Sequence, residues 1–353
     1  MAEEETLVRV GVLGASGYAG GELVRLLEAH PATDVTFLGA KGSVGDTLME
    51  AHPYLAPTSV AGLPLRAIEP GAIADAADIV FSSLPHGASA ELAPQLLELG
   101  LRVVDLAGDF RLEPRDYPEW YGFEHPSPGW VDKAVYGLPE LLREHVPGAQ
   151  LVANPGCYPT PVILGLAPLL RAELIEPGPI TVDGKTGLSG AGKVPTGPTT
   201  YASTEESVRP YRAPRHQHTP EMERGLELTS GHAVPVLFVP HLVPTVRGVL
   251  TTCYARLMAG VTTVELTECL GEVYAGRPFV RVSPPGEMVD SKRVRGTNVV
   301  ELQALADPRT GTAVVVGAVD NLVKGAAGQA VQNMNLLLGL PEETALPMVA
   351  VYP

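Results

Sequence analysis

One cysteine in the chain stands in a sequence setting that favours chemistry. The segment around Cys157 reads NPGCYPT and leads into an apolar run of helical character from Val162 to Leu170. Proline is tolerated only in the first turn of a helix, so Pro159 and Pro161 predict a helix that begins just after the cysteine. A thiol at a helix N-terminus meets unpaired N–H groups and the positive end of the helix dipole, and both favour the nucleophilic thiolate. Cys157 is therefore the predicted catalytic nucleophile.

The other two cysteines fit an inert role. Cys253 belongs to the strand-like segment LTTCYAR, and Cys269 belongs to a helical segment between residues 264 and 273. A buried, unreactive thiol is the usual state of a free cysteine. The three cysteines show no CxxC spacing, so neither a disulfide framework nor a zinc site is predicted.

Two histidines are candidates for moving a proton. His216 and His218 are separated by one residue, so on an extended segment their side chains would face the same side. Either could exchange a proton with a substrate oxygen or with a departing phosphate, and the sequence leaves the choice between them open. Such a pair can also bind a metal ion, but no third ligand stands at a recognisable spacing, so no metal site is predicted.

A glycine-rich turn near the N-terminus indicates a dinucleotide site. Gly14, Gly17 and Gly20 lie between a predicted buried strand at 7–13 and a predicted helix at 22–30. Glycine is needed where the backbone turns tightly and where it approaches a pyrophosphate, which the free N–H groups of a helix N-terminus stabilise. Its place at the first strand–helix junction favours this function over a purely structural turn.

The end of the second predicted strand, at 35–39, indicates which dinucleotide is bound. NAD sites usually place an acidic residue there to bind the ribose 2′-hydroxyl. This chain instead reads FLGAKGS over 37–43, which offers Lys41 and Ser43 and no acid. A cation beside a hydroxyl suits a 2′-phosphate, so NADP is the predicted cofactor. A merely solvated loop lysine is the alternative interpretation of Lys41.

The wider pattern predicts a doubly wound α/β sheet followed by a second domain. Apolar runs at 77–82 and 101–106 flank a helical segment at 89–99, and this alternation is typical of a parallel sheet. Strand-like segments at 179–183, 234–239, 249–257 and 312–319 then predict an α+β domain with a mixed, largely antiparallel sheet. A helix at 326–338 could pack back on the first domain. The expected domains are 1–154 with 322–353 for dinucleotide binding, and 155–321 for catalysis and dimerisation.

One segment and the overall composition complete this picture. Residues 184–218 are rich in Gly, Pro, Ser and Thr, and we expect a long loop there. The formal net charge of -15 speaks against nucleic acid as a partner, because phosphate-backbone binding needs clustered Lys and Arg. No apolar run is long enough to span a bilayer, and the acidic start MAEEE is unlike a secretory signal, so we expect a cytoplasmic protein without membrane partners.

A series of segments along the chain forms a characteristic set: GASGYAG at 14–20, LPHG at 84–87, DLAGDFRL at 105–112, VYGLPEL at 135–141, NPGCYPT at 154–160, GKTGLSGAGK at 184–193, RHQHTPE at 215–221, RG at 247–248 and DNLVKGAAGQAVQNMN at 320–335. In these segments and in their order, the chain resembles a known family, the N-acetyl-gamma-glutamyl-phosphate reductases of arginine biosynthesis. The segments cover nearly the whole chain and together are highly specific. One departure is Pro161, where a small residue such as Gly or Ala would be expected.

The resemblance implies a Rossmann-type domain, an α+β domain of the semialdehyde dehydrogenase type, and a reduction of an acyl phosphate that passes through a Cys157 thioester. It implies that His216 and His218 form the catalytic element and that the protein is a homo-oligomer, a dimer or a tetramer. The substrate-binding residues it implies are Arg111, Ser189 and Glu221. The cofactor-binding residues it implies, beside the three glycines, are Ser16, Tyr18, Lys41, Ser43, Pro85, Gly190, Asn321 and Lys324.

Three alternatives remain at this stage. The related reductase of lysine biosynthesis acts on a carrier-protein-linked aminoadipyl phosphate, but its relatives tend to carry Asn and small residues after the cysteine, where this chain has Tyr158-Pro159-Thr160. Aspartate-semialdehyde dehydrogenases share the architecture but have a different histidine context. A non-catalytic NADP sensor would need no nucleophile, so Cys157 with its histidine pair speaks against one.

Overall fold

The computed structural model describes residues 7–352, and these form two compact units. The first unit comprises the described residues up to Pro139, together with Arg143–Pro155 and Ala326–Leu346. The second comprises Glu140–Leu142, Gly156–Gly325 and the described residues from Pro347 onward. Compared with the expected boundaries, residues 322–325 and the segment after Leu346 group with the second unit.

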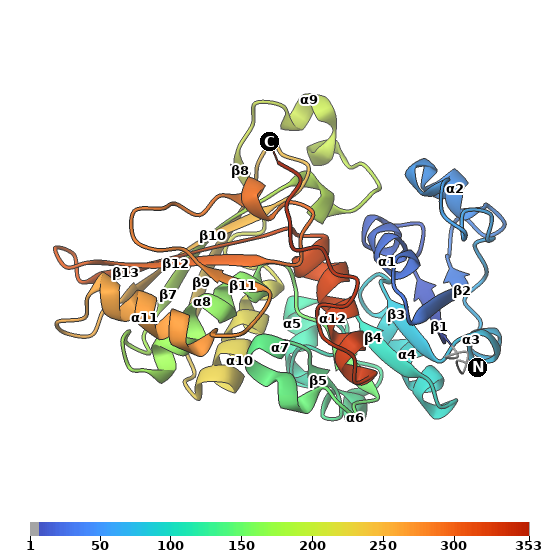
Figure 1. The fold of residues 1–353 in the computed structure, drawn as a ribbon, viewed down its shortest axis with the longest axis horizontal. Coiled ribbons are helices and arrows are strands. Elements are labelled where there is room, and N and C mark those ends of the chain that lie inside the picture. Colours follow the sequence, from blue (N-terminus) through green and yellow to red (C-terminus); the bar gives the residue numbers. More distant parts are fainter. Residues whose placement is uncertain (1–6, 353) are drawn as a thin grey trace, which may run out of the picture. The chain divides into compact units, whose positions relative to one another are not determined.

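The first unit is built on a six-stranded sheet in the order β2-β1-β3-β4-β6-β5, in which every pairing is parallel (Figure 1). Its strands are β1 (Val8–Leu13), β2 (Thr33–Gly39), β3 (Ile79–Ser82), β4 (Arg102–Asp105), β5 (Val135–Tyr136) and β6 (Leu151–Ala153). Its helices are α1 (Tyr18–Glu28), α2 (Leu48–Ala51), α3 (Pro70–Ala76), α4 (Ala88–Glu98), α5 (Tyr117–Trp120), α6 (Pro128–Val131) and α12 (Gly328–Leu337). The predicted doubly wound parallel sheet is confirmed.

Helix α12 returns to the first unit although it comes almost last in the chain, as predicted. The helix is polar in composition yet buried, because each amide side chain finds a partner. Asn335 contacts His30 at the end of α1 with 2.8 Å between Oδ1 and Nε2. Asn333 donates to the carbonyl of Gly137 and to Asn154 Oδ1. These directional hydrogen bonds fix the position of α12 on the first unit, which packing of an apolar face alone would not do.

The second unit is a seven-stranded mixed sheet in the order β11-β12-β13-β10-β7-β9-β8. Four of its pairings in the described residues are antiparallel and two are parallel, as predicted. Its strands are β7 (Ile180–Thr186), β8 (Arg209–Pro210), β9 (Val236–Leu242), β10 (Val249–Arg256), β11 (Val280–Val282), β12 (Val300–Asp307) and β13 (Thr312–Val319). Its helices are α8 (Pro159–Arg171), α9 (Tyr201–Thr204), α10 (His218–Ser230) and α11 (Thr263–Val273), while α7 (Pro139–Leu142) spans the boundary of the two units in the chain.

One face of this sheet packs against α8, α10 and α11. Val182, Cys253 and Val315 lie side by side in register on that face, and a Cβ at Gly165 of α8 would come within 2.8 Å of Val315. The opposite face presents the alternating residues of the same strands, among them Leu237 and Tyr254. Their side chains remain 49% and 40% exposed, so this face is an open, partly apolar surface.

The expected loop at 184–218 needs correction. Strand β7 continues to Thr186, and the following stretch contains short 3₁₀ turns, α9 and the two-residue strand β8 before α10 begins at His218. Hydrogen bonds between Thr196 and Thr199 close one of these turns. The small polar residues here form local turns. Their abundance in the sequence is equally typical of short turns and of an open loop, so composition alone could not distinguish the two.

Candidate active site

Cys157 lies directly before α8, which begins at Pro159 as predicted. Its side chain is partly exposed. The backbone of Gly325 passes so close that a Cβ there would lie 2.7 Å from Cys157 Cβ. Glycine at 325 therefore allows the turn that precedes α12 to border the thiol.

The N-terminus of α8 offers the thiol fewer N–H donors than the sequence predicted. Pro159 and Pro161 have no N–H group, and the Thr160 N–H donates to the Gly156 carbonyl at 3.1 Å. The first turn of α8 therefore offers fewer N–H donors than an ordinary helix start, because the prolines that mark this start have no N–H group. The positive end of the helix dipole remains as the favourable influence.

His216 and His218 lie together, with ring centroids 4.8 Å apart, but not for the predicted reason. The segment is not extended, since α10 begins at His218 and the His218 N–H donates to His216 Nδ1 at 3.1 Å. The tight entry into the helix folds the rings against each other. His216 is buried, whereas the side chain of His218 is 13% exposed.

Glu221 joins the nucleophile's loop to this histidine pair. The carboxylate is fully buried, and Oε1 accepts a hydrogen bond from the Gly156 N–H at 2.7 Å. Oε2 lies 3.9 Å from His218 Nε2. The carboxylate therefore fixes the backbone one residue before Cys157 and stands beside the more exposed histidine. Sequence reasoning had placed Glu221 among the substrate-binding residues.

An aromatic wall that the sequence analysis missed surrounds the pair. Tyr158 stacks edge-on against both histidine rings and against Phe238, and Tyr211 stacks against His216. Burial raises the pKa of both tyrosine hydroxyls, which hydrogen-bond to each other. Tyr158 follows Cys157 directly and could have been suspected on that ground. Tyr211 has no such signal, because the turns that bring it here are not visible in the sequence.

The two cysteines expected to be inert are placed accordingly. Cys253 is buried in β10, and burial raises the pKa of its thiol to about 12. Cys269 lies on α11, where burial and then the charge of Glu272 raise its pKa. Neither environment favours a thiolate.

Ser189, Gly190 and Asn321 come together in the second unit. Asn321 Nδ2 donates to Ser189 Oγ at 2.9 Å, and its Oδ1 accepts from the Gly248 N–H at 2.8 Å. Gly190 lies on the exposed side of the same turn, where a Cβ would be 3.9 Å from Asn321 Nδ2. Asn321 thus holds the turn that presents Ser189 and Gly190.

Lys324 has a partner that the sequence did not indicate. Its ammonium group is completely buried and lies 2.6 Å from Glu140 Oε1, with the ring of Phe279 5.6 Å away. A buried ion pair of this kind is costly to break, since removing one partner leaves an uncompensated charge. The pair stands one residue before Gly325 and so supports the turn that borders Cys157.

In the first unit, Gly14 and Gly17 lie in the turn between β1 and α1, whereas Gly20 lies in the first turn of α1 itself. Gly14 has φ of +80°, and a Cβ there would lie 2.2 Å from the Ser83 carbonyl oxygen. A Cβ at Gly20 would lie 2.2 Å from the Gly14 oxygen, so both positions require glycine for packing. Gly17, the residue before α1, meets only the Gly14 oxygen at 3.4 Å, so contacts within the protein do not explain glycine there.

The remaining predicted residues of this unit also follow the carboxyl ends of parallel strands. Ser16 and Tyr18 belong to the glycine turn, Lys41 and Ser43 follow β2, Pro85 follows β3 and Arg111 follows β4. Tyr18, Lys41 and Pro85 are exposed, and Ser43 is partly exposed. This edge of a parallel sheet is where ligands of doubly wound folds bind.

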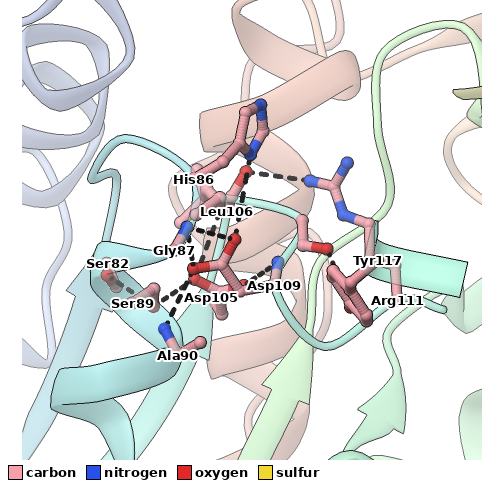
Figure 2. A network of polar contacts seen from close by, with 12 residues as sticks. Ser82, His86, Gly87, Ser89, Ala90, Asp105, Leu106, Asp109, Arg111 and Tyr117 are labelled. Carbon is pink, nitrogen blue, oxygen red and sulfur yellow. Dashed lines mark hydrogen bonds and ion pairs between the residues drawn. The ribbon is translucent and has the colours of Figure 1, made fainter. Parts of the chain in front are cut away.

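Arg111 is buried within a polar network of this unit (Figure 2). Its Nη2 donates to the Leu106 carbonyl at 2.8 Å, and its charge counteracts those of Asp105 and Asp109. Asp109 accepts from the N–H groups of Gly87 and Ala90 and thereby caps α4 from a distant part of the chain. Apart from the motif that contains Arg111, no sequence pattern predicted this network.

Asp105 is, like Asp109, a fully buried carboxyl group of that network. Ser89 Oγ donates to it at 2.5 Å, and the N–H groups of Ala107 and Asp109 also donate to it. Burial and the neighbouring Asp109 nevertheless raise the pKa of Asp105 to about 6. His86 Nδ1 lies 3.8 Å from Asp109 at the exposed rim of the network.

The described residues contain neither a metal-binding cluster nor a membrane-spanning helix. No group of three or more His, Cys, Asp or Glu side chains among residues 7–352 is arranged to hold a metal ion. No helix in that part of the chain is long and apolar enough to cross a bilayer.

Comparison with known proteins identifies two family models in the chain. Residues 9–149 match the semialdehyde dehydrogenase NAD-binding domain, and residues 157–321 match the semialdehyde dehydrogenase dimerisation domain. Among solved structures, aspartate semialdehyde dehydrogenase II from Vibrio cholerae covers 95% of this chain and 99% of its own, with a TM-score of 0.71 at 18% identity. The Candida albicans aspartate semialdehyde dehydrogenase with NADP gives 0.71 at 18% identity over 94% of this chain and 99% of its own. These likenesses establish the fold.

Curated relatives are much more similar in sequence. The N-acetyl-gamma-glutamyl-phosphate reductase of Brevibacillus brevis is 45% identical over 98% of this chain and 100% of the relative. The enzyme of the same name from Symbiobacterium thermophilum is 47% identical over 98% of this chain and 99% of the relative. The chain therefore belongs to the N-acetyl-gamma-glutamyl-phosphate reductase family of semialdehyde dehydrogenases.

Proposed function

We propose that the protein reduces N-acetyl-gamma-glutamyl phosphate to N-acetylglutamate semialdehyde and phosphate, with NADPH as the reductant, in arginine biosynthesis. The observation that carries the proposal is one buried carboxylate, Glu221, which accepts from the N–H group of Gly156, next to Cys157, and lies beside His218, in a chain of this family. A sensor that only binds NADP would have no use for this arrangement.

The chemistry begins at the thiol. The Cys157 thiolate attacks the acyl-phosphate carbon, the bond from that carbon to the phosphate oxygen breaks, and phosphate leaves a thioester behind. A dinucleotide held by the residues that follow β1 and β2 would supply the hydride that reduces the thioester. The thiohemiacetal on Cys157 then breaks its C–S bond, which releases the semialdehyde and restores the thiol. His216 or His218 exchanges the proton at the substrate oxygen. The greater exposure of His218 and its place beside Glu221 favour His218 for that exchange.

The residues present fit a dinucleotide in the first unit. Gly17 has room that the protein does not fill, directly at the N-terminus of α1, where N–H groups and the helix dipole suit a pyrophosphate. Lys41 and Ser43 stand after β2 without an acid between residues 37 and 45, which suits a 2′-phosphate and favours NADP over NAD. Ser16, Tyr18, Pro85, Gly190, Asn321 and Lys324 are further proposed contacts, Lys324 acting through its support of the turn before α12.

The assignment of the units follows from this. We assign cofactor binding to the first unit and catalysis to the second, with Arg111 and Ser189 contributing to the binding of the substrate's anionic groups. The protein is proposed to work in the cytoplasm as a homodimer or a homotetramer. The open face of the second unit's sheet, which lies within the segment matched by the dimerisation-domain model, is the proposed contact between copies.

The test runs the reaction backwards, because acyl phosphates are unstable. NADPH formation is followed from N-acetylglutamate semialdehyde and NADP, with and without inorganic phosphate. Wild type is compared with Cys157→Ala and with Cys269→Ala as the matched cysteine control. We expect turnover that requires phosphate, vanishes in Cys157→Ala and persists in Cys269→Ala, while Cys157→Ala still binds NADP.

Other outcomes point to the alternatives. Turnover only with the carrier-linked aminoadipate semialdehyde would identify the reductase of lysine biosynthesis. Cofactor binding without turnover on either substrate would leave a binding protein. Full activity in Cys157→Ala would overturn the thioester mechanism.

A further inference from the structure

A second cation stands at the end of β2, on a segment that the sequence motifs do not include. Arg66 is joined to that strand end through its backbone, since its N–H donates to the Leu38 carbonyl at 2.8 Å and its carbonyl accepts from the Ala40 N–H at 3.0 Å. The preceding residue, Leu65, accepts from the Gly45 N–H at 2.9 Å. These bonds tie both ends of the loop at 40–45 to residues 65 and 66, so Arg66 lies directly beside the loop.

The side chain of Arg66 is ordered but accessible. Its guanidinium carbon lies 4.8 Å from the centroid of the Phe37 ring, a cation–π contact. Phe37 is buried, and its ring reaches toward the last residue of β2, since a Cβ at Gly39 would lie 3.3 Å from Phe37 Cε1. Arg66 itself is exposed, so the contact fixes one part of the guanidinium while solvent reaches the rest.

The end of β2 and the loop that follows it carry a positive side chain and no negative one before Asp46. Residues 37–45 include Lys41 and no acid, and Asp46 follows only where the loop closes. Within residues 7–352, neither Lys41 nor Arg66 forms an ion pair with a carboxylate. Two unneutralised cations therefore flank a loop that also carries the Ser43 hydroxyl, an arrangement suited to a dianion.

We propose that Arg66 is a specificity-determining residue that binds the 2′-phosphate of NADP together with Lys41 and Ser43. The inference rests on the proposed function and adds to it the residue that selects the cofactor. A guanidinium offers paired N–H donors to a phosphate, which an ammonium cannot. Because Phe37 already orders the side chain, binding loses less side-chain entropy than it would with a free surface arginine.

Direct binding tests the proposal without relying on catalysis. Isothermal titration calorimetry measures NADP, NAD, adenosine 2′,5′-bisphosphate and adenosine 5′-monophosphate against wild type, Arg66→Ala, Arg66→Lys and Lys133→Ala. Lys133 is the matched control, because its ammonium also lies over an aromatic ring, Trp130, just before β5 at the opposite edge of the sheet.

We expect Arg66→Ala to weaken binding of both 2′-phosphorylated ligands by about tenfold or more, the usual size of a charge-assisted hydrogen bond. Binding of NAD and of adenosine 5′-monophosphate should change by less than about twofold, since a surface substitution distant from their phosphates removes no contact. The affinity of Arg66→Lys for the 2′-phosphorylated ligands should lie between that of wild type and that of Arg66→Ala. Lys133→Ala should bind all four ligands as wild type does. NADP binding should depend less on salt concentration in Arg66→Ala than in wild type.

The outcomes separate this inference from the proposed function. If wild type prefers NADP and Arg66→Ala keeps that preference, the assignment of Arg66 is overturned and the function stands. Equal losses for NADP and NAD in Arg66→Ala and in Arg66→Lys, with unchanged thermal unfolding, would also overturn it by assigning Arg66 to the adenine. If wild type binds NAD and NADP equally, both the proposed preference for NADP and the role of Arg66 are overturned. Phosphate-dependent turnover with NAD would in that case still support the proposed reaction.

Discussion

Glu221 shows how a single buried carboxylate can serve two neighbours. One oxygen holds the backbone N–H of Gly156 and the other faces the ring of His218, while the side chain has no exposed surface. A buried carboxylate needs such partners, because an unpaired charge in the interior is strongly unfavourable. The geometry therefore makes Glu221 a positioning residue for the nucleophile, whatever it contributes to substrate binding.

Replacing Glu221 should separate these contributions. Glu221→Leu leaves the Gly156 N–H without its acceptor, which costs about 1–3 kcal/mol of the free energy of unfolding. Glu221→Gln keeps an acceptor but loses the charge beside His218. We expect kcat to fall in both variants, and the alkylation of Cys157 by iodoacetamide without substrate to slow more in the Leu variant. Glu227→Gln, an exposed change on the same helix, is the control; unchanged alkylation in Glu221→Leu would contradict the positioning role.

Asp105 makes stability depend on pH in a direction that can be derived. Its pKa in the folded protein is about 6, raised by burial and by Asp109 above its ordinary value of 3.8. The folded state therefore binds this proton more tightly, and the resulting stability is complete below pH 3.8 and lost as the pH rises through about 6. Ser89, Arg111 and the Ala107 N–H oppose the shift without cancelling it.

Asp105→Asn removes this titration. The variant loses a hydrogen-bond acceptor at every pH, but its unfolding free energy should gain on that of wild type between pH 4 and 7 by roughly 1–3 kcal/mol. Urea unfolding of both proteins across that range measures the difference, with the exposed Asp132→Asn as control. A difference that stays flat with pH would show that Asp105 does not titrate in this window.

At the scale of elements, close approaches of backbone to side chain set the position of Cys157. Gly325 belongs to the π-helical turn Val323–Ala327 and leaves no room for a methyl group beside the thiol-bearing residue. On α8, Pro161 packs in a similar way against Gly317 of β13, where a Cβ would lie 2.8 Å from the proline ring. The proline that departs from the family pattern therefore has a complementary glycine.

Gly325→Ala should damage activity more than stability. The new methyl group must push Cys157 or the turn aside, so we expect kcat to drop at least tenfold, because a displacement of about 1 Å can cost 10²-fold. The control is Gly271→Ala, in α11, where nothing lies within 4 Å of the new Cβ. That variant should be more stable by roughly 0.5–1 kcal/mol and fully active. Equal activities in the two variants would rule out the steric account.

The elements also show what sequence can and cannot predict. Strands such as β1 and β13 were predicted within a residue or two, because buried apolar runs leave few choices. The start of α8 just after Cys157 was predicted because prolines mark helix starts, whereas His216 and His218 meet through the entry into α10 and not on an extended segment. The partnership of Lys324 with Glu140, and that of Asp109 with α4, joins residues far apart in the chain. No local sequence pattern reveals such contacts. Lys324 was therefore predicted to bind the cofactor, whereas in the structure its ammonium group pairs with Glu140.

At the scale of the whole molecule, the open sheet face predicts an assembly. Leu237 and Tyr254 are exposed on the face opposite the helices. Tyr254→Asp should therefore shift the protein from dimer to monomer, since a charge in an apolar contact is not compensated. Sedimentation equilibrium measures the mass, and Leu99→Asp, an equally exposed leucine after α4, is the control. A Tyr254→Asp protein with the wild-type mass would move the interface elsewhere.

The late position of α12 has a consequence for how the chain is made. The first unit begins near the N-terminus, but the helix that contacts α1 and β4 and holds His30 through Asn335 lies at residues 328–337. While the ribosome is still translating the second unit, the surface that α12 will cover on the first remains bare. The first unit cannot complete its fold until the 170 intervening residues, Gly156–Gly325, have also been synthesised. We therefore expect truncated chains that stop before α12 to bind chaperones and to be degraded by proteases, even though they contain the whole glycine-rich turn.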